Sequence, residues 1–270
     1  MAAGAWLAWG WLLATSPAAP QKDAGFRTLE PGLELGVFNG PTGAVGDRRI
    51  YIVRIDLAHF TLKLLNASAP GEGRIHTARE WCARAGAQAG INASMFRDDG
   101  RSVAMMRTRT HVNHPTLSRD QSVLAFDRLQ PGHPDAMLID RECDDLGALG
   151  RAYGTLVQSI RMLSCRRANR WTPSPRRWST AAIGTDGRGR VLFIHARSPW
   201  PVHHLIQALI ALPIDLRRAM YVEGGPEAQL YVHAGTEELE RVGSFETGFN
   251  ENDDNARAWA IPNVVVAVRR

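Results

Sequence analysis

Cysteine is scarce in this sequence of 270 residues, which contains only Cys82, Cys143 and Cys165. Their spacings match no zinc-binding pattern, which argues against a structural zinc site built on cysteines. The odd count leaves at least one thiol unpaired. Two interpretations stay open: three unpaired, mostly buried thiols, or one disulfide in an exported chain, between two cysteines that the sequence does not select.

Lysine is scarcer still, because the 32 basic residues include only Lys22 and Lys63, and all the others are arginines. Against 27 acidic residues they leave a formal net charge of +5. No basic helix and no ladder of basic and aromatic residues accompanies this excess, so we expect a surface of mixed charge and no nucleic-acid partner. Arginine does suit the bidentate recognition of phosphate or carboxylate, which keeps an anionic substrate open.

Long hydrophobic runs are absent beyond the N-terminus, which excludes a protein that crosses the membrane several times. The N-terminus itself has an apolar centre, Ala5-Trp6-Leu7-Ala8-Trp9-Gly10-Trp11-Leu12-Leu13-Ala14, and small residues follow it. Although the usual basic residues are missing, this pattern predicts that residues 1–18 are a signal peptide or an N-terminal anchor, with cleavage after about Ser16 or Ala18. We therefore expect the protein to be exported, to the periplasm or outside the cell, with no other membrane span.

Hydrophobic residues make up 44% of the chain and charged residues 22%, which is the balance of an ordinary globular protein. Residues 19–48 carry proline and glycine with little periodicity and are predicted to be a linker and a lead-in strand. From Arg49 the pattern becomes dense, and no second boundary follows. We therefore expect one domain over residues 49–270.

Two helices and many short strands are predicted in this domain. Thr77 and Glu80 match a capping box, so a helix should run to about Ala85 and end at Gly86. The spacing of apolar residues predicts a second helix over Val202–Leu212, and residues 185–189 are typical of a hairpin turn. The strands Arg49–Asp56 and Phe60–Leu65 should pair as an antiparallel hairpin. Further strands are expected over Ser122–Phe126, Ala136–Ile139, Thr155–Ile160, Ser179–Gly184, Arg190–His195, Ala219–Glu223, Gln229–His233 and Asn263–Val268. This mixture predicts an α+β fold, a single domain of mostly antiparallel sheet with two main packed helices.

The segment around Gly224 and Gly225 is the most informative for function. A predicted strand ends on Glu223, the two glycines allow a sharp turn and the close approach of a ligand, and Glu227 follows. Two carboxylates at such a turn suit acid–base or nucleophilic work on a glycosidic bond, although two solvated loop acids are the plainer alternative. A second candidate is Asn92, whose amide follows a buried strand and either faces a ligand or forms a turn.

The order of these motifs resembles that of the phosphodiester glycosidase domain family, which includes the N-acetylglucosamine-1-phosphodiester α-N-acetylglucosaminidase-like proteins. The similarity spans about residues 49–268, and the chain resembles a divergent, bacterial-type member. The segments that carry the resemblance are Ile91-Asn92-Ala93-Ser94-Met95-Phe96, Val157-Gln158-Ser159-Ile160, Ala181-Ala182-Ile183-Gly184, the helix 202–212, Val222-Glu223-Gly224-Gly225-Pro226-Glu227-Ala228-Gln229-Leu230, and Ile261-Pro262-Asn263-Val264-Val265.

Several positions depart from the family pattern. Glu223 stands where the family usually has Asp, and Glu227 stands where it usually has Ser. The family's arginine before the Ala-Ile-Gly strand falls on Thr180, and the nearest arginine, Arg177, would lie on the other strand face.

The resemblance implies an exported hydrolase that cleaves the anomeric C–O bond of a sugar 1-phosphodiester, so the partner would be a carbohydrate or glycan phosphodiester. Positive charge is needed near the phosphate oxygens, and Arg161 and Arg107 are the candidates for it. The anomeric carbon gains oxocarbenium character, so a carboxylate has to stabilise it or activate water. Glu223 is the first candidate for that role and Glu227 the second.

The remaining site candidates have supporting roles. Asn92 and Gln158 would hold sugar or phosphate oxygens. His195 would be a second base, or else a satisfied core residue. In the acidic run Asn250–Asn255, the side chains of Glu251, Asp253 and Asp254 are candidates for binding a divalent metal, but the run lacks the EF-hand spacing and a solvated loop is the alternative. No other cofactor is implied.

Two other functions stay open. The lost serine and the displaced arginine favour a non-catalytic envelope protein that binds an anionic glycan. A hydrolase with changed specificity, acting on another glycosidic or ester bond, would retain the two carboxylates at the Gly-Gly turn.

Overall fold

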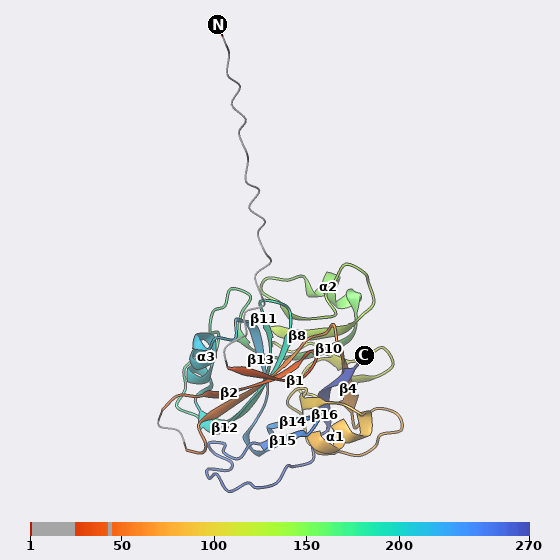
Figure 1. Ribbon diagram of the computed structural model, residues 1–270. Helices are drawn as coiled ribbons and strands as arrows, with labels where there is room; N and C mark the ends of the chain where they lie inside the picture. The colour runs from red at the N-terminus through yellow and green to blue at the C-terminus, as the bar shows by residue number, and fades with distance from the viewer. Residues whose placement is uncertain (2–24, 43–44) are drawn as a thin grey trace.

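Two sheets form the body of the protein, whose computed structural model describes Met1, residues 25–42 and residues 45–270 (Figure 1). Every strand pair in the described part is antiparallel. The larger sheet runs in the order β1-β2-β3-β12-β11-β13-β10-β6-β7, with β8 and β9 attached through β10, and the smaller runs β15-β14-β5-β16-β4. The strands of the larger sheet are β1 (Phe26–Glu30), β2 (Leu33–Asn39), β3 (Arg49–Ile55), β6 (Met106–Arg107), β7 (Val112–His114), β8 (Ser122–Arg128), β9 (Ala136–Asp140), β10 (Tyr153–Leu163), β11 (Trp178–Asp186), β12 (Val191–Trp200) and β13 (Leu216–Gly224). Those of the smaller sheet are β4 (Phe60–Asn66), β5 (Ala89–Asn92), β14 (Gln229–Ala234), β15 (Glu237–Val242) and β16 (Asn263–Arg269).

The layers follow from the alternation of side chains along each strand. Val53 and Ile55 of β3 face the core between the two sheets, whereas Ile50 and Ile52 face the opposite side, where helix α3 (Val202–Ala211) packs. The same alternation in β16 sends Val265 to the shared core and its neighbours to helix α1 (Ala78–Ala85). The sheets therefore stack face to face, with one helix on each outer side (Figure 1).

The two predicted helices are confirmed at nearly the expected bounds. Thr77 and Glu80 form the capping box of α1, and Gly86 ends the helix in the left-handed conformation with φ 61°. A further short helix, α2 (Leu146–Leu149), and two 3₁₀ turns, η1 (Gly150–Ala152) and η2 (Gly225–Glu227), complete the helical elements of the described residues. The prediction of a single, mostly antiparallel domain with few helices is thus correct at this level.

The predicted hairpin of residues 49–56 and 60–65 is wrong. β3 pairs with β2 and β12, whereas β4 pairs with β16 in the other sheet. The turn after Ile55 carries the chain across the core, and strand patterns alone do not reveal such a crossing. Within the stretch predicted as linker and lead-in, β1 and β2 form a hairpin at the edge of the larger sheet.

A disulfide joins Cys143 to Cys165, across 22 residues of sequence, and Cys82 is a free thiol on the buried face of α1. Burial raises the pKa of the Cys82 thiol to about 12, which makes it unreactive as a thiolate. Of the alternatives left open by the sequence, the structure therefore has one disulfide and one buried thiol.

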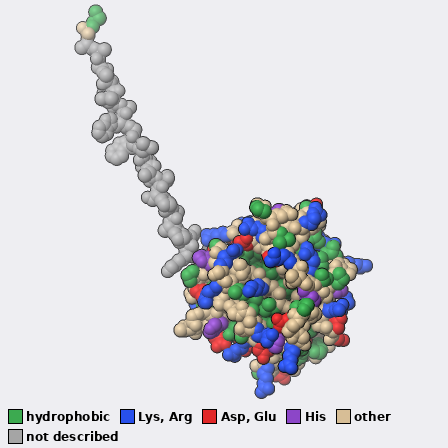
Figure 2. Space-filling view, turned by 90° about the vertical axis from the view of Figure 1, so that its right-hand side faces the viewer, with side chains coloured by type: hydrophobic (Ala, Val, Ile, Leu, Met, Phe, Trp, Pro, Cys, Tyr) green, Lys and Arg blue, Asp and Glu red, His purple; other side chains and the backbone are tan. Residues whose placement is uncertain are grey.

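Basic and acidic side chains are interspersed on the face drawn in Figure 2, in keeping with the mixed surface expected from the composition. None of the helices that the structure describes combines the length and the apolarity needed to cross a membrane. The predicted signal peptide or anchor, residues 1–18, lies outside the described residues except for Met1.

Candidate active site

The Gly-Gly turn carries the chain from one sheet to the other, because β13 ends at Gly224 in the larger sheet and β14 begins at Gln229 in the smaller. Gly224 has no room for a side chain, since a Cβ there would collide with the Tyr221 hydroxyl. Gly225 has φ +61°, the left-handed region that favours glycine. The two glycines thus let the backbone turn where larger residues would not fit.

A β-bulge in β13 positions Glu223. Ala181 of β11 pairs with Glu223 and the next residue, Ala182, pairs with Tyr221, so Val222 is an extra residue in β13. Bulges of this kind re-aim a side chain at the end of a strand. The Glu223 carboxyl accepts a hydrogen bond from the Gly224 N–H at 3.0 Å and is only 9% exposed.

Three carboxyl groups surround the turn. A Cβ placed on Gly225 would lie 2.6 Å from an Oε atom of Glu246 and 3.5 Å from one of Glu227, so these two side chains share a small volume. Burial, together with the negative charges of Glu227 and Glu246, raises the pKa of Glu223 to about 8. Burial and the charge of Glu246 also raise the pKa of Glu227. Two neighbouring acids with raised pKa values, here Glu223 and Glu227, are characteristic of acid–base sites.

An aromatic wall stands beside these acids. The ring of Tyr221 contacts Trp171 at a centroid distance of 5.3 Å and Trp178 at 6.4 Å, and the Trp178 indole lies against Gly224. Trp171 and Trp178 are half-buried, so part of the wall is open to solvent. Aromatic faces of this kind suit the apolar faces of sugar rings.

Two arginines flank the wall. The Arg176 guanidinium lies 5.6 Å from the Trp178 ring centroid and donates to the Thr247 carbonyl oxygen at 3.3 Å. The Arg177 guanidinium lies 5.5 Å from the ring of Phe245, and the Arg177 N–H donates to the Thr247 hydroxyl at 3.0 Å. Neither guanidinium has an ion-pair partner among the described residues, which leaves donors free for an anion.

Asn92 lies at this site, but both ends of its amide are used by the turn. Its Nδ2 donates to the Glu227 carbonyl oxygen at 2.9 Å, and its Oδ1 accepts from the Gln229 N–H at 2.7 Å. The side chain is 1% exposed. Asn92 therefore fixes the backbone on both sides of Ala228 and so positions Glu227.

His195, in β12, also contacts the turn, at the backbone of Ala228. Its Nε2–H donates to the Ala228 carbonyl oxygen at 3.2 Å, and its Nδ1 is buried without a partner. Burial and the nearby Arg241 and Arg197 charges lower the pKa of His195 to about 3. The imidazole is therefore neutral and a poor base at neutral pH, and the geometry gives it a positioning role.

Three other candidates have their polar atoms engaged within the protein. The amide of Gln158 is fully buried and ties β10 to the preceding loop, accepting from Ser118 N–H at 2.9 Å and donating to the Asp120 carbonyl oxygen at 2.7 Å. Arg107 donates to the carbonyl oxygens of Gly150 and Gly154 at 3.1 and 3.2 Å. Arg161 is paired with Asp140 at 2.6 Å and Glu142 at 2.8 Å. The structure thus commits all three side chains to contacts within the protein.

The acidic run does not gather into a cluster. Asp253 pairs with Arg197 at 2.9 Å, Glu251 accepts from the Gly248 N–H at 2.7 Å, and Asp254 is exposed. In the described part of the chain, Asp140, Cys143 and Cys165 are the one group of three possible ligand residues with their ligand atoms within 4.8 Å. Two of these are joined in the disulfide, so this group does not hold a metal while oxidised.

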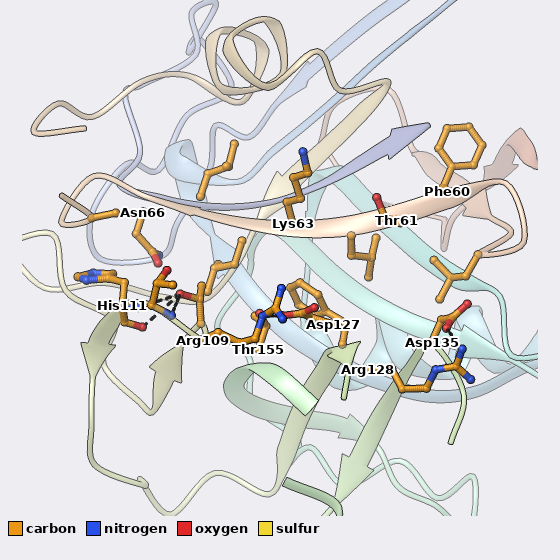
Figure 3. Close-up of a pocket in the computed structure, with 18 of the residues that line it drawn as sticks. Phe60, Thr61, Lys63, Asn66, Arg109, His111, Asp127, Arg128, Asp135 and Thr155 are labelled. Atoms are coloured by element: carbon orange, nitrogen blue, oxygen red, sulfur yellow. Dashed lines mark hydrogen bonds and ion pairs between the residues drawn. The ribbon is translucent and has the colours of Figure 1, made fainter. Parts of the chain in front are cut away.

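A cavity of about 900 Å³ lies elsewhere, between β4 and the end of β8 (Figure 3). Its lining includes the Arg109–Asp127 ion pair at 2.9 Å and none of the residues predicted for the site. Asp135 is paired there with Arg128 at 3.1 Å and with Arg270 at 2.6 Å. The acids with raised pKa values, Glu223 and Glu227, lie at the Gly-Gly turn and do not line this cavity.

Sequence reasoning missed Glu246, Trp171, Trp178 and Arg176. Trp171, Arg176 and Glu246 come from loops and Trp178 comes from the start of β11, and only the tertiary fold brings them to the turn. Trp178 opens β11 and bridges to the backbone of Glu246, a contact between segments 68 residues apart. The single local signal was the position of Arg176 and Trp178 directly before the Ala-Ile-Gly strand.

A model of the phosphodiester glycosidase family matches residues 85–268. The protein belongs to this family. The solved structure of the zebrafish N-acetylglucosamine-1-phosphodiester alpha-N-acetylglucosaminidase catalytic domain, auto-inhibited by its pro-peptide, is similar with a TM-score of 0.62 at 12% identity, covering 92% of this chain and 87% of that one. A hypothetical protein from Synechocystis is similar with a TM-score of 0.58 at 11% identity, covering 89% of this chain and 62% of that one. These two likenesses concern the fold alone. Among curated proteins, none matches the sequence significantly.

Proposed function

We propose that this protein is an exported hydrolase that cleaves the anomeric C–O bond of a sugar 1-phosphodiester. The observation that carries the proposal is the gathering of three acids around the Gly-Gly turn: Glu223 and Glu227, from the motif by which the chain resembles its family, and Glu246, from a later loop. Membership of the phosphodiester glycosidase family supports the class of reaction. The aromatic wall beside the acids supports a sugar as the substrate.

Glu223 and Glu227 differ in burial, and this difference assigns them different roles in the reaction. With a pKa of about 8, Glu223 is mostly protonated at neutral pH and would hydrogen-bond, as an acid, to the bridging oxygen of the phosphodiester. Glu227 is more exposed and would take the proton of the water that attacks the anomeric carbon. The phosphate monoester then leaves as an anion. This assignment reverses the order in which the resemblance suggested the two acids, because burial keeps Glu223 neutral.

The negative charge of the phosphodiester is unfavourable next to three acids, so the site needs a cation to bind it. Arg161 and Arg107 are engaged elsewhere, whereas Arg176 and Arg177 lie next to Trp178 and Glu246 with donors to spare. We assign the phosphate oxygens to Arg176, in place of the arginine that the family has where this chain has Thr180.

Export belongs to the proposal as well. The apolar N-terminal run and its small-residue end support it. The Cys143–Cys165 disulfide supports it too, because such bonds persist in oxidising compartments.

The experiment is a hydrolysis screen of the chain lacking residues 1–18 against hexose and N-acetylhexosamine 1-phosphodiesters, with the Glu227→Gln variant beside it. Removing a group that acts in the transition state should lower kcat by about 100-fold or more with little change in KM. Glu240→Gln, at an exposed position of β15, is the matched control and should keep the wild-type rate. An unchanged rate for Glu227→Gln on a hydrolysed substrate would refute the assignment.

A further inference from the structure

Tyr221 brings a hydroxyl group to the acids of the candidate active site. Its oxygen occupies the place where a Cβ on Gly224 would lie, so the missing side chain of Gly224 makes the room for it. The N–H of the same glycine donates to the Glu223 carboxyl at 3.0 Å. The phenol of Tyr221 and the carboxyl of Glu223 therefore lie against one glycine, at the end of β13.

The Tyr221 hydroxyl has no hydrogen-bond partner among the described residues. Its oxygen is nevertheless not sealed from solvent, unlike the indole nitrogen of the neighbouring Trp178, which is buried without a partner. Polar groups in the interior are normally paired, and those that are not call for an explanation. A hydroxyl that solvent can reach and that no protein group engages is free to bind a ligand.

Packing holds this hydroxyl in a fixed position. The Tyr221 side chain is only 5% exposed, and its ring lies between Trp171 and Trp178. The Ser159 hydroxyl donates to the Tyr221 carbonyl oxygen and fixes the backbone as well. The phenol is thus preorganised, so binding a ligand costs it little conformational entropy.

The surroundings of the phenol favour a donor. Burial and the negative charges of Glu223, Glu246 and Glu227 raise the pKa of Tyr221 well above its usual value. The hydroxyl therefore keeps its proton at neutral pH and can give it to an acceptor on the substrate as a hydrogen bond. Loss of the proton, which would make the oxygen a nucleophile, is unfavourable beside three acids.

The phosphate of the substrate is the acceptor that this donor fits best. Arg176, which is assigned to the phosphate oxygens, lies over the Trp178 ring, and the Tyr221 ring packs against Trp178 as well. A guanidinium and a phenol on one indole place two donors in the same part of the site. Because hydrogen bonds to charged acceptors are the stronger ones, a phosphate oxygen gains more from the phenol than a sugar hydroxyl does.

We propose that the Tyr221 hydroxyl donates a hydrogen bond to a non-bridging phosphate oxygen of the substrate and keeps this bond as the phosphate monoester leaves. The inference rests on the proposed function, which places the bridging oxygen at Glu223 and the phosphate charge at Arg176. Tyr221 then makes the site selective for phosphodiesters over glycosides that carry no phosphate.

The binding test uses Tyr221→Phe, which keeps the ring and should leave thermal unfolding unchanged, because the hydroxyl has no partner among the described residues. Calorimetric titration with methyl phosphate, the monoester that a methyl-esterified substrate releases, should show about tenfold lower affinity in the variant. The affinity for the methyl glycoside of the same sugar should not change. Tyr231→Phe is the matched control, since it removes a hydroxyl that donates to Glu238 at 3.0 Å, and it should bind both ligands as the parent does. Equal affinities of Tyr221→Phe and the parent for methyl phosphate, no binding of it to the parent, or an equal loss for both ligands would overturn the proposal.

Kinetics keep this proposal separate from the proposed function. On a methyl-esterified sugar 1-phosphate, the kcat/KM of Tyr221→Phe should fall about tenfold or more, and an unchanged value would overturn the proposal. If the parent hydrolyses no phosphodiester but its affinity for methyl phosphate depends on Tyr221, the hydrolase proposal fails and the phosphate contact stands. If the parent hydrolyses the diester and Tyr221→Phe matches it in rate and in affinity, the hydrolase proposal stands and the role of Tyr221 is wrong.

Discussion

Glu246 packs its carboxylate against the one face of Gly225 where a side chain would emerge, 2.6 Å from the place of the absent Cβ. The glycine therefore does two things: it adopts φ +61°, and it leaves the space in which Glu246 approaches Glu227. The spacing of the acids in the site depends on this absent methyl group.

Gly225→Ala should therefore lower the free energy of unfolding by more than the backbone strain of a positive φ alone. Gly235 also has a positive φ, +60°, but no atom lies within 4 Å of its absent Cβ, so Gly235→Ala measures the backbone strain alone. That strain is about 1 kcal/mol. Gly225→Ala should destabilise the protein further and displace Glu246, which urea unfolding of both variants can measure. Equal losses in the two variants would show that Glu246 does not press on the turn.

Stability should fall as the pH rises through neutrality, because of Glu223. Its pKa is raised from 4.5 to about 8 by burial, so its contribution is fully present below about pH 4.5 and is lost as the pH approaches 8. Glu223→Gln removes the charge and should flatten this dependence, making the variant more stable than the parent near pH 8. Thermal unfolding from pH 5 to 8 tests it, with the exposed Glu240→Gln as control. Parallel curves for the parent and Glu223→Gln would argue against a buried, protonated Glu223.

Asn92→Ala should loosen the turn without removing a contact to the substrate, because both ends of the amide are bonded to the turn. The variant leaves the Glu227 carbonyl and the Gln229 N–H without their partner, which costs roughly 1–3 kcal/mol in a buried position. Since Glu227 is then less well placed, kcat should fall more than KM rises. Unfolding and steady-state kinetics measure the two effects, and a rise in KM alone would indicate that Asn92 contacts the substrate directly.

The disulfide should matter for stability more than for chemistry. It closes a loop of 22 residues, so Cys143→Ser should cost about 3 kcal/mol. Dithiothreitol should destabilise the parent by a similar amount and leave Cys143→Ser unchanged. Cys82→Ala, which removes the buried free thiol, should keep its response to dithiothreitol. A parent insensitive to dithiothreitol in denaturant would contradict this expectation.

Much of the fold was predictable where the signal is local. The capping box of Thr77 and Glu80, the glycine stop at Gly86 and the turn of residues 185–189 each specify structure within a few residues, and all three are present. The partner of β4 was not predictable, because strand pairing depends on segments about 200 residues apart, as in the pairing of Asn66 with Asn263. Neighbouring strands in sequence need not be neighbours in a sheet.

The same distinction applies to the site. Glu223, Glu227 and the two glycines lie within one motif and are found together, whereas Glu246 and Trp171 come from loops and Trp178 comes from another strand. Arg161 and Gln158 were candidates through the family resemblance, but the contacts that engage them, with Asp140 and with Ser118, come from other strands and loops. Composition shows which groups can do chemistry, and only the fold shows which of them are already occupied.

Hydrolysis in water enriched in ¹⁸O identifies the bond that the protein breaks. If the acids at the Gly-Gly turn direct water to the anomeric carbon, the new oxygen enters the sugar, and the phosphate monoester released shows no isotope shift in its ³¹P spectrum. Glu227→Gln should slow the labelling of the sugar by the same factor as it slows hydrolysis. Label in the phosphate monoester would mean that the P–O bond is broken instead, and would contradict the roles assigned to Glu223 and Glu227.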